Sequence, residues 1–240
     1  MTGRRVIVTG GASGIGAAAA RRLSESGDRV WVFDVAPARP SVLARGTGWS
    51  SVDVRSEASV KQGFDEAISA LGGLDVLINC AGIATTARLE DTDFATWSRL
   101  VDVNLTGVYL CCRAALEPLK ASTSSSIVNL ASASGLTPSF AGAAYSASKA
   151  GVIMLSKALA REVAPKVRVN AVCPGAVETP MFDQMTGGAA GAAEQVGRDY
   201  ALQRIATPEE IVDAIQFLSG PSAQFITGVA LAVDGGRSFH

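Results

Sequence analysis

Short apolar runs alternate along this chain with longer stretches in which apolar residues recur at helical spacing. The apolar runs predict strands at residues 5–9, 30–33, 48–53, 74–79, 126–131, 167–172 and 228–233. The remaining patterns predict helices at residues 17–23, 56–71, 93–120 and 143–163. Because strands and helices alternate to the end, we expect an α/β fold with a mostly parallel, doubly wound sheet and helices on both faces.

Three segments add detail to this pattern. Residues 207–210, Thr-Pro-Glu-Glu, have the form of a capping box at the start of a helix. Residues 35–47 are rich in alanine, proline and glycine, which predicts a short connection where a full helix would often stand. Residues 181–200 place four glycines among apolar side chains. Since glycines permit hinge motion and apolar side chains can close over a ligand, we predict a mobile substrate lid there; the alternative is an ordinary surface loop.

The composition is that of a globular protein with one large core. The 240 residues are 48% hydrophobic and 18% charged, which suits a single domain over residues 1–240. The formal net charge is -1 and no run of lysine or arginine is present, so nucleic acid is not expected as a partner. The first apolar run is too short for a signal or membrane-spanning segment. We therefore expect a soluble, cytoplasmic protein with no membrane partner.

The cysteines give no sign of a metal site. Cys80, Cys111, Cys112 and Cys173 lie in apolar strand or helix patterns and lack the spacing of metal ligands. Buried, reduced thiols are the expected state.

A glycine-rich turn follows the first predicted strand. It reads Thr9-Gly10-Gly11-Ala12-Ser13-Gly14-Ile15-Gly16, and an alanine-rich helix pattern follows directly. Strand, glycine turn and helix are the setting of a dinucleotide site, because glycines let the backbone approach a pyrophosphate and the helix start offers free amide groups. No Gly-Lys-Ser or Gly-Lys-Thr closes the turn, which argues against a P-loop. A tight connection without a ligand is the structural alternative.

Asp34 ends the second predicted strand, about twenty residues beyond the glycine turn. A carboxylate at that place can bind an adenosine ribose and repel a 2′-phosphate. Ser13 and Val35 stand where a phosphate-binding base would be expected, and both are uncharged, so the sequence favours NAD over NADP. Arg39 is near enough in sequence to keep NADP open, and a solvated carboxylate is the structural alternative.

Tyr145 and Lys149 are four positions apart in a predicted helix, so their side chains share one face. An ammonium close to a phenol favours the phenolate, which would bring the pKa of Tyr145 from its ordinary value towards the operating pH. The only histidine, His240, is the last residue, and a chain end rarely positions a general base. By itself the pair could be only a lysine lying along a half-buried ring.

Together these motifs resemble the short-chain dehydrogenase/reductase family over residues 6–236. The family's motifs occur in its order as the glycine turn, Asp53-Val54, Asn79-Cys80-Ala81-Gly82, Asn104, Ser132, Tyr145 with Lys149, and Pro174-Gly175 with Val177 and Thr179. Cys80 departs from the family's second asparagine, a position that we interpret as tolerant of change. The resemblance implies a Rossmann-like sheet with strand order 3-2-1-4-5-6-7.

The resemblance also implies the site residues. The implied catalytic residues are Asn104, Ser132, Tyr145 and Lys149. The implied cofactor-binding residues are Gly10, Ser13, Gly14, Ile15, Gly16, Asp34, Asp53, Val54, Asn79, Ala81, Gly82, Tyr145, Lys149, Pro174, Gly175, Val177 and Thr179. In the family the Asp-Val pair meets the adenine, the lysine holds the nicotinamide ribose and lowers the pKa of the tyrosine, and the asparagine holds a water that relays protons. Family members are commonly homotetramers assembled through the helices that contain Asn104 and Tyr145.

Several of these residues have ordinary structural alternatives. Ser132 would stand at the carboxyl end of a parallel strand and hydrogen-bond a substrate carbonyl, but Ser134 is a neighbouring competitor. Asn104 in an apolar helical stretch could be a buried amide paired with local backbone. Thr179 precedes a proline and could be a helix N-cap.

We therefore expect an NAD-dependent oxidoreductase that interconverts a secondary alcohol and a ketone, with Tyr145 as general acid/base. A 3-oxoacyl carrier-protein reductase using NADPH and a non-catalytic protein that senses nicotinamide are the alternatives; an enoyl reductase would space its tyrosine and lysine farther apart. The candidate pocket residues Leu136, Phe140, Met181, Phe182 and Met185 are mainly apolar. Such a pocket suits cyclic, aromatic or steroid-like alcohols, dihydrodiols or medium-chain ketones as the small-molecule substrate.

Overall fold

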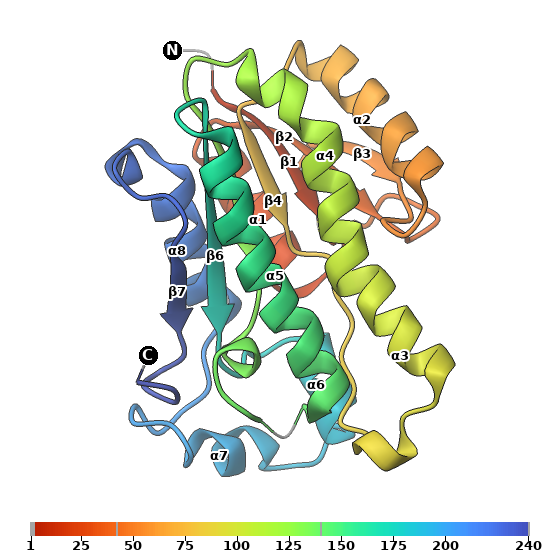
Figure 1. The fold of residues 1–240 in the computed structure, drawn as a ribbon, viewed down its shortest axis with the longest axis vertical. Coiled ribbons are helices and arrows are strands. Elements are labelled where there is room, and N and C mark those ends of the chain that lie inside the picture. The colour runs from red at the N-terminus through yellow and green to blue at the C-terminus, as the bar shows by residue number, and fades with distance from the viewer. Residues whose placement is uncertain (1–2, 42, 140, 240) are drawn as a thin grey trace.

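The computed structural model describes residues 3–41, 43–139 and 141–239, and one parallel sheet runs through it (Figure 1). Its strand order is β3-β2-β1-β4-β5-β6-β7, and every strand pair in this sheet is parallel. The strands are β1 (Arg5–Thr9), β2 (Arg29–Asp34), β3 (Gly48–Ser51), β4 (Val76–Asn79), β5 (Ser125–Leu130), β6 (Val167–Pro174) and β7 (Ala230–Val233). Each boundary lies within two residues of the prediction, and the predicted order is confirmed.

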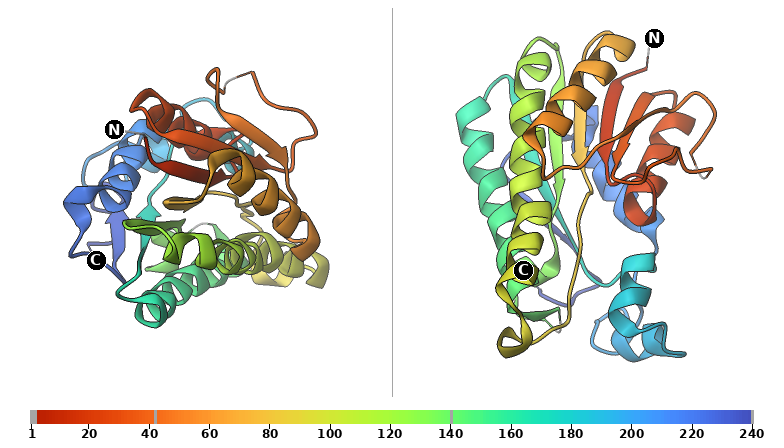
Figure 2. Two further views of the ribbon diagram at one scale, coloured as in Figure 1. Left: turned by 90° about the horizontal axis from the view of Figure 1, so that it is seen from above. Right: turned by 90° about the vertical axis from the view of Figure 1, so that its right-hand side faces the viewer.

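Helices cover both faces of the sheet, as Figure 2 shows. One face carries α1 (Gly14–Glu25) and α8 (Pro208–Ser219), and the other carries α2 (Glu57–Leu71), α4 (Gly107–Lys120) and α5 (Gly142–Val163). Because successive strand residues point to opposite faces, β1 contributes to both cores. Its Ile7 packs in the core under α2, α4 and α5, while Val6 and Val8 pack in the core under α1 and α8.

The predicted helical stretch at residues 93–120 is confirmed and contains a π-helical turn. Asp93 caps α3 (Phe94–Val101) by accepting a hydrogen bond from the Thr96 amide at 2.7 Å. A π-helical turn, η2 (Asp102–Thr106), then joins α3 to α4. A π turn holds one residue more than an α turn and is found preferentially at functional sites. Asn104 is the buried residue of this turn.

Short helices gather beyond the carboxyl ends of the strands, where α6 and α7 are drawn at the foot of Figure 1. They are η1 (Leu89–Asp91), η3 (Ala133–Gly135), α6 (Pro180–Thr186) and α7 (Ala192–Gly197), whereas η4 (Pro221–Ala223) follows α8 at the opposite, amino-terminal ends of the strands. The predicted capping box is confirmed, since Thr207 and Glu210 bond each other's backbone at the start of α8. The described part of residues 35–47 contains no helix, as expected.

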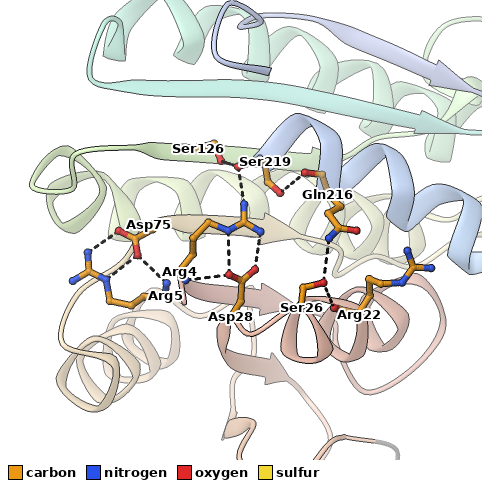
Figure 3. A network of polar contacts seen from close by, with 9 residues as sticks. All are labelled: Arg4, Arg5, Arg22, Ser26, Asp28, Asp75, Ser126, Gln216 and Ser219. Carbon is orange, nitrogen blue, oxygen red and sulfur yellow. Dashed lines mark hydrogen bonds and ion pairs between the residues drawn. The ribbon is translucent and has the colours of Figure 1, made fainter. Parts of the chain in front are cut away.

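A polar network joins the opposite, amino-terminal ends of the strands (Figure 3). Arg4 pairs with Asp28 at 2.6 Å and donates to the Ser219 carbonyl at 2.9 Å, so the start of β1 is bound to the end of α8. Arg5 pairs with Asp75 at 2.6 Å. Although burial acts to raise the pKa of Asp75, the hydrogen bonds from Arg5 and Ser122 outweigh it and lower this pKa to about 2. These pairs hold the sheet far from the carboxyl-end chemistry.

In the described part of the chain, no helix combines the length and the apolar character needed to cross a bilayer.

Candidate active site

A cavity of about 420 Å³ opens at the carboxyl ends of the strands, where open α/β sheets bind ligands. Nearly all the residues predicted from sequence line it. They are Gly10, Ser13, Gly14, Ile15, Gly16, Asp34, Asp53, Val54, Ala81, Gly82, Ser132, Tyr145, Lys149, Pro174, Gly175, Val177 and Thr179. Asn79 and Asn104 are not among the lining residues. Segments far apart in sequence are thus brought to one site.

The glycine turn packs tightly against the neighbouring strand. Gly10 has φ +67°, and a Cβ built there would lie 2.6 Å from the backbone of Ala81, so another side chain would force the two segments apart. Ser13 is the N-cap of α1 but makes no side-chain capping bond within the described residues, and the first turn of α1 has no acidic residue. The helix start therefore offers amide groups and a positive dipole end to an anion.

Asp34 stands beside this turn. Its carboxylate accepts hydrogen bonds from the Ala12 amide at 3.0 Å and the Ala36 amide at 3.2 Å. Arg39, the residue that left the cofactor preference open, donates to the carbonyls of Leu43 at 3.1 Å and Ala44 at 2.6 Å. The guanidinium of Arg39 is thus bound within its own loop, and Arg39 does not line the cavity.

Arg55 is a cavity residue that the sequence reasoning did not identify. Its guanidinium pairs with Asp53 at 2.7 Å. The hydrogen bond from Arg55 is the main reason why the pKa of Asp53 lies below its ordinary value. The carboxylate of Asp53 is thereby engaged, while Val54 presents an apolar surface beside it in the cavity.

Tyr145 and Lys149 lie one turn apart on α5 and face the cavity together, as their spacing predicted. The Lys149 Nζ lies 5.9 Å from the centre of the Tyr145 ring and donates to the Leu130 carbonyl at 2.8 Å. Tyr145 is only 8% exposed and Lys149 only 4%. The end of β5 therefore holds the ammonium at the bottom of the cavity.

Burial controls the titration of this pair. Burial raises the pKa of Tyr145 above its ordinary value, and a hydrogen bond with Ser132 opposes that change. Burial also lowers the pKa of Lys149 to about 8. The net shift of the Tyr145 pKa is therefore upward, opposite to the direction expected from sequence. Loss of water around the buried phenol is the main cause of this shift, and the hydrogen bond with Ser132 is the opposing one.

Ser132 and Ser134 both line the cavity, but they have different partners. Ser132 caps η3 by accepting a hydrogen bond from the Ser134 amide at 3.1 Å, and it is the serine that interacts with Tyr145. The Ser134 hydroxyl is 2.6 Å from that of Ser139 and forms a hydrogen bond with it. The structure thus favours Ser132 over its competitor as the partner of Tyr145.

Asn104 lies within the π turn and is fully buried. Its amide accepts from the Ile83 N–H at 2.9 Å and donates to the Ile83 carbonyl at 2.9 Å and to the Ser148 hydroxyl at 3.0 Å. Ser148 in turn donates to the Tyr145 carbonyl at 2.7 Å. These bonds match the structural alternative for Asn104, and they also connect it to α5. The sequence showed only an asparagine within an apolar helical stretch, and this pattern did not predict a π turn.

Asn79 lies beneath the cavity floor rather than in it. Asn79 is 1% exposed, and its side-chain Nδ2 donates to the side-chain Oδ1 of Asn129 at 2.8 Å. Asn129 donates to the Ser156 hydroxyl at 2.9 Å. This buried series of bonds joins β4, β5 and α5, so the side chain of Asn79 has a structural role here.

The segment after β6 forms another wall. Thr179 lines the cavity and is also the N-cap of α6, because its hydroxyl accepts from the Phe182 amide at 3.3 Å. Tyr200, which the sequence reasoning did not identify, accepts a hydrogen bond from the Ala176 amide at 2.7 Å through its phenol oxygen. A Cβ on Gly175 would lie 2.6 Å from the Tyr200 ring, so the ring holds this segment closely. The hydrogen bond between Ala176 and Tyr200 joins residues that are 24 positions apart in the chain, so it forms only in the folded protein.

The part of the cavity expected to hold the substrate has more polar lining residues than the sequence predicted. Met181, Phe182 and Met185 line it as predicted, but Leu136 does not and packs against the main core instead. Phe140 lies outside the described residues, as does His240. The lining residues that were not predicted include Arg99, Ser139, Tyr200 and Arg237.

Three of the cysteines are buried, as predicted, while Cys80 is partly exposed and lines the cavity. Burial raises the pKa of the Cys80 thiol to about 12. Within residues 3–41, 43–139 and 141–239, no group of histidine, cysteine or acidic side chains is arranged to hold a metal ion.

These features together fit a nicotinamide dinucleotide. The close glycine turn and the uncapped start of α1 suit a pyrophosphate, and Asp34 suits a ribose. Ser132, Tyr145 and Lys149 lie farther along the same cavity, where a reacting group would meet a hydroxyl, a phenol and an amine. Such an arrangement supports proton exchange with a substrate oxygen.

Known proteins were matched over almost the whole chain. A family model described as Enoyl-(Acyl carrier protein) reductase matches residues 10–238. Cis-4-hydroxycyclohexanecarboxylate dehydrogenase of Sinomonas cyclohexanicum is 42% identical, covering 97% of this chain and 96% of that protein. The 3-alpha-(or 20-beta)-hydroxysteroid dehydrogenase of Mycobacterium tuberculosis is 36% identical, covering 98% and 90%.

Solved structures agree in fold. The ligand-free aldohexose dehydrogenase of Thermoplasma acidophilum has a TM-score of 0.93 and 34% identity, covering 99% of this chain and 95% of that one. The 3-ketoacyl-(acyl-carrier-protein) reductase of Brucella melitensis, solved with NADH, has a TM-score of 0.90 and 32% identity, covering 98% of each chain.

Proposed function

The chain belongs to the short-chain dehydrogenase/reductase family and is an NAD(P)-dependent dehydrogenase or reductase, and we propose that it interconverts a secondary alcohol and a ketone with NAD. The observation that carries this proposal is the meeting of Ser132, Tyr145 and Lys149 in one cavity with the glycine turn. The spacing of four between tyrosine and lysine supports an alcohol and ketone chemistry over an enoyl reduction.

The proposed chemistry divides into three tasks for this chain. When bound, a nicotinamide supplies the acceptor or donor of hydride. Tyr145 exchanges the proton of the substrate hydroxyl, and Ser132 donates a hydrogen bond to the same oxygen. Lys149, protonated below its pKa of about 8, stabilises the phenolate and binds ribose hydroxyls. The proton relay through Asn104 stays a prediction.

The substrate is proposed to be an alicyclic secondary alcohol. The names of the matched relatives include a hydroxycyclohexanecarboxylate and hydroxysteroids as the compounds acted on. The apolar side chains of Met181, Phe182 and Met185 offer a surface for a saturated ring. A panel of cyclic and open-chain secondary alcohols and ketones, followed at the nicotinamide absorbance, tests this; an absence of turnover with all of them would contradict it.

NAD is expected to be preferred over NADP by at least about tenfold in kcat/KM, the ratio that roughly 1.4 kcal/mol of repulsion produces. Asp34 supplies the repelling charge, and Arg39 is bound to the Leu43 and Ala44 carbonyls. Replacing Asp34 by asparagine should reduce the preference mainly by improving NADP. Steady-state kinetics with both cofactors measures this, with Asp65→Asn as the control for an exposed acid. A preference for NADP in the unaltered protein would overturn the assignment.

The 3-oxoacyl carrier-protein reductase alternative has one observation in its favour, the structural match to a 3-ketoacyl-(acyl-carrier-protein) reductase. That protein was solved with NADH, so cofactor choice alone does not separate the two readings. A protein that only senses nicotinamide has no need of Ser132 and Tyr145 side by side. We therefore favour oxidation of an alicyclic alcohol over both alternative functions.

Residues 181–200 are proposed to close over the bound substrate. The segment contains α6 and α7, and Gly187, Gly188 and Gly191, which join them, all have positive φ. The apolar side chains of α6 face the cavity, so closure would bury them against a substrate. Limited proteolysis should cut this segment more slowly with NAD and substrate together than with neither. Equal cleavage rates in both conditions would contradict a lid.

A homotetramer and a cytoplasmic location stay predictions. The tetramer is supported by exposed apolar side chains on the two helices concerned, Tyr109 on α4 and Met154 on α5, which are 45% and 63% exposed.

A further inference from the structure

Arg237 brings a positive charge to the wall of the catalytic cavity. It follows β7 in the turn Asp234-Gly235-Gly236-Arg237, in which both glycines have positive φ. The Asp234 carboxylate accepts hydrogen bonds from the Gly236 amide at 3.1 Å and the Ser238 amide at 3.0 Å. Asp234 is 7% exposed and therefore holds the turn rigid from within. The turn presents the arginine to the cavity on a fixed support.

The guanidinium of Arg237 is directed at the loop that follows the catalytic serine. It donates to the Thr137 hydroxyl at 3.3 Å and to the Pro138 carbonyl at 3.1 Å. Both partners are neutral, and none of the ion pairs among the described residues includes Arg237. A guanidinium has five donor hydrogens, so these two bonds leave its charge and further donors for a ligand.

The charges on the cavity wall are separated along the sheet. The lining acids within the described residues are Asp34 and Asp53, which follow β2 and β3 at one edge. Arg237 follows β7 at the opposite edge of the sheet. Tyr145 and Lys149 lie between the two edges, on the helix that connects β5 to β6. The dinucleotide features occupy the acidic side, so the basic side is left to the substrate. The charge of Asp53 is paired with Arg55, so Asp34 is the acid without an ion pair on that side among the described residues. An anionic substrate would be attracted to Arg237 at the opposite edge.

We propose that Arg237 binds a carboxylate carried by the substrate, which makes the preferred substrate an alicyclic hydroxy acid or keto acid. This inference rests on the proposed function and adds a specificity residue to it. The planar guanidinium matches a carboxylate with paired N–H donors, an arrangement that a point charge does not reproduce. The apolar side chains of α6 contact the ring, Tyr145 and Ser132 meet its hydroxyl, and Arg237 fixes the far end.

The test compares a charged and a neutral form of one molecule. Cis-4-hydroxycyclohexanecarboxylate and its primary amide are assayed with NAD on the unaltered protein and on Arg237→Gln. We expect kcat/KM for the acid to fall about 10- to 100-fold in Arg237→Gln, mainly through KM, as the loss of a charge-assisted hydrogen bond implies. The amide should change less than about threefold. Arg237→Lys should keep part of the acid preference, because the charge remains while the planar geometry is lost.

Arg99 is a further arginine on the cavity wall and, unlike Arg55, forms no ion pair among the described residues, so it supplies the matched control. Arg99→Gln should leave the ratio of acid to amide unchanged. If Arg99→Gln removes the preference, or if Arg237→Gln slows the acid and the amide equally, the assignment to Arg237 is wrong and its role is to hold the loop at residues 137–138. Absence of any preference for the acid in the unaltered protein would also overturn it.

A binding measurement separates this inference from the proposed reaction. Cyclohexanecarboxylate has no hydroxyl to oxidise, so calorimetry on the NAD-loaded protein measures its affinity without turnover. Binding that is lost in Arg237→Gln supports the carboxylate site even if neither alcohol is oxidised, an outcome that would contradict the proposed function alone. Turnover of neutral alcohols without carboxylate binding would instead contradict only the role of Arg237.

Discussion

Replacing Tyr145 by phenylalanine is expected to lower kcat for alcohol oxidation on the order of 10²- to 10⁴-fold, the range that general acid/base catalysis supplies. Phenylalanine keeps the ring and its packing but cannot exchange a proton. The described residues offer no substitute, because among those that line the cavity only Tyr145 places a phenol beside both Ser132 and Lys149. Steady-state and single-turnover kinetics measure the change.

Binding of NAD and folding should be largely unchanged in Tyr145→Phe. Fluorescence titration with NADH and thermal unfolding provide those controls, and Tyr109→Phe provides a matched variant with the same chemical change at a 45% exposed position on α4. If Tyr145→Phe retains near-normal turnover, the tyrosine is not the proton-exchanging group. If Tyr145→Phe fails to bind NADH, lost cofactor binding explains the lost activity. The variant Ser132→Ala then tests the proposed catalytic site instead.

Replacing Lys149 by methionine should have opposite effects on activity and on stability. Turnover is expected to fall on the order of 10²- to 10⁴-fold, because the phenolate of Tyr145 loses its neighbouring charge. The free energy of unfolding at pH 7 is expected to rise by roughly 1 to 2 kcal/mol. Burial lowers the pKa of Lys149 from 10.5 to about 8, so the folded protein bears a cost for the charge that the unfolded chain does not. The lost hydrogen bond to Leu130 offsets part of the gain.

The stability gain of Lys149→Met is expected to depend on pH. The folded pKa of Lys149 is depressed, so the destabilising contribution is fully present below about 8 and disappears as the pH rises through 10.5. The stability difference between Lys149→Met and the unaltered protein should therefore shrink between pH 8 and pH 10 in urea unfolding. Lys157→Met, an exposed position on the same helix, should show no such change. A Lys149→Met protein that is less stable at pH 7 would contradict this explanation.

The fold and most of the site could be predicted because their signals are local. The alternation of buried runs and amphipathic stretches determines the elements, and the parallel order follows from the family that the motifs identify. The glycine turn requires conformations that other residues resist, as Gly10 shows, so its sequence reports its geometry. The pair Tyr145 and Lys149 is similarly local, since a spacing of four on a helix places both on one face.

Contacts across the sheet were decided only by the tertiary structure. Arg237 and Tyr200 enter the cavity from turns whose partners, the Pro138 and Ala176 backbones, lie 99 and 24 residues away. The pKa of Tyr145 was misjudged for the same reason, because burial depends on everything packed around a group and not on its neighbour along the helix. Leu136 likewise turned to the core. Periodicity and backbone preference act between residues close in sequence, whereas solvation and side-chain pairing depend on which segments folding brings together.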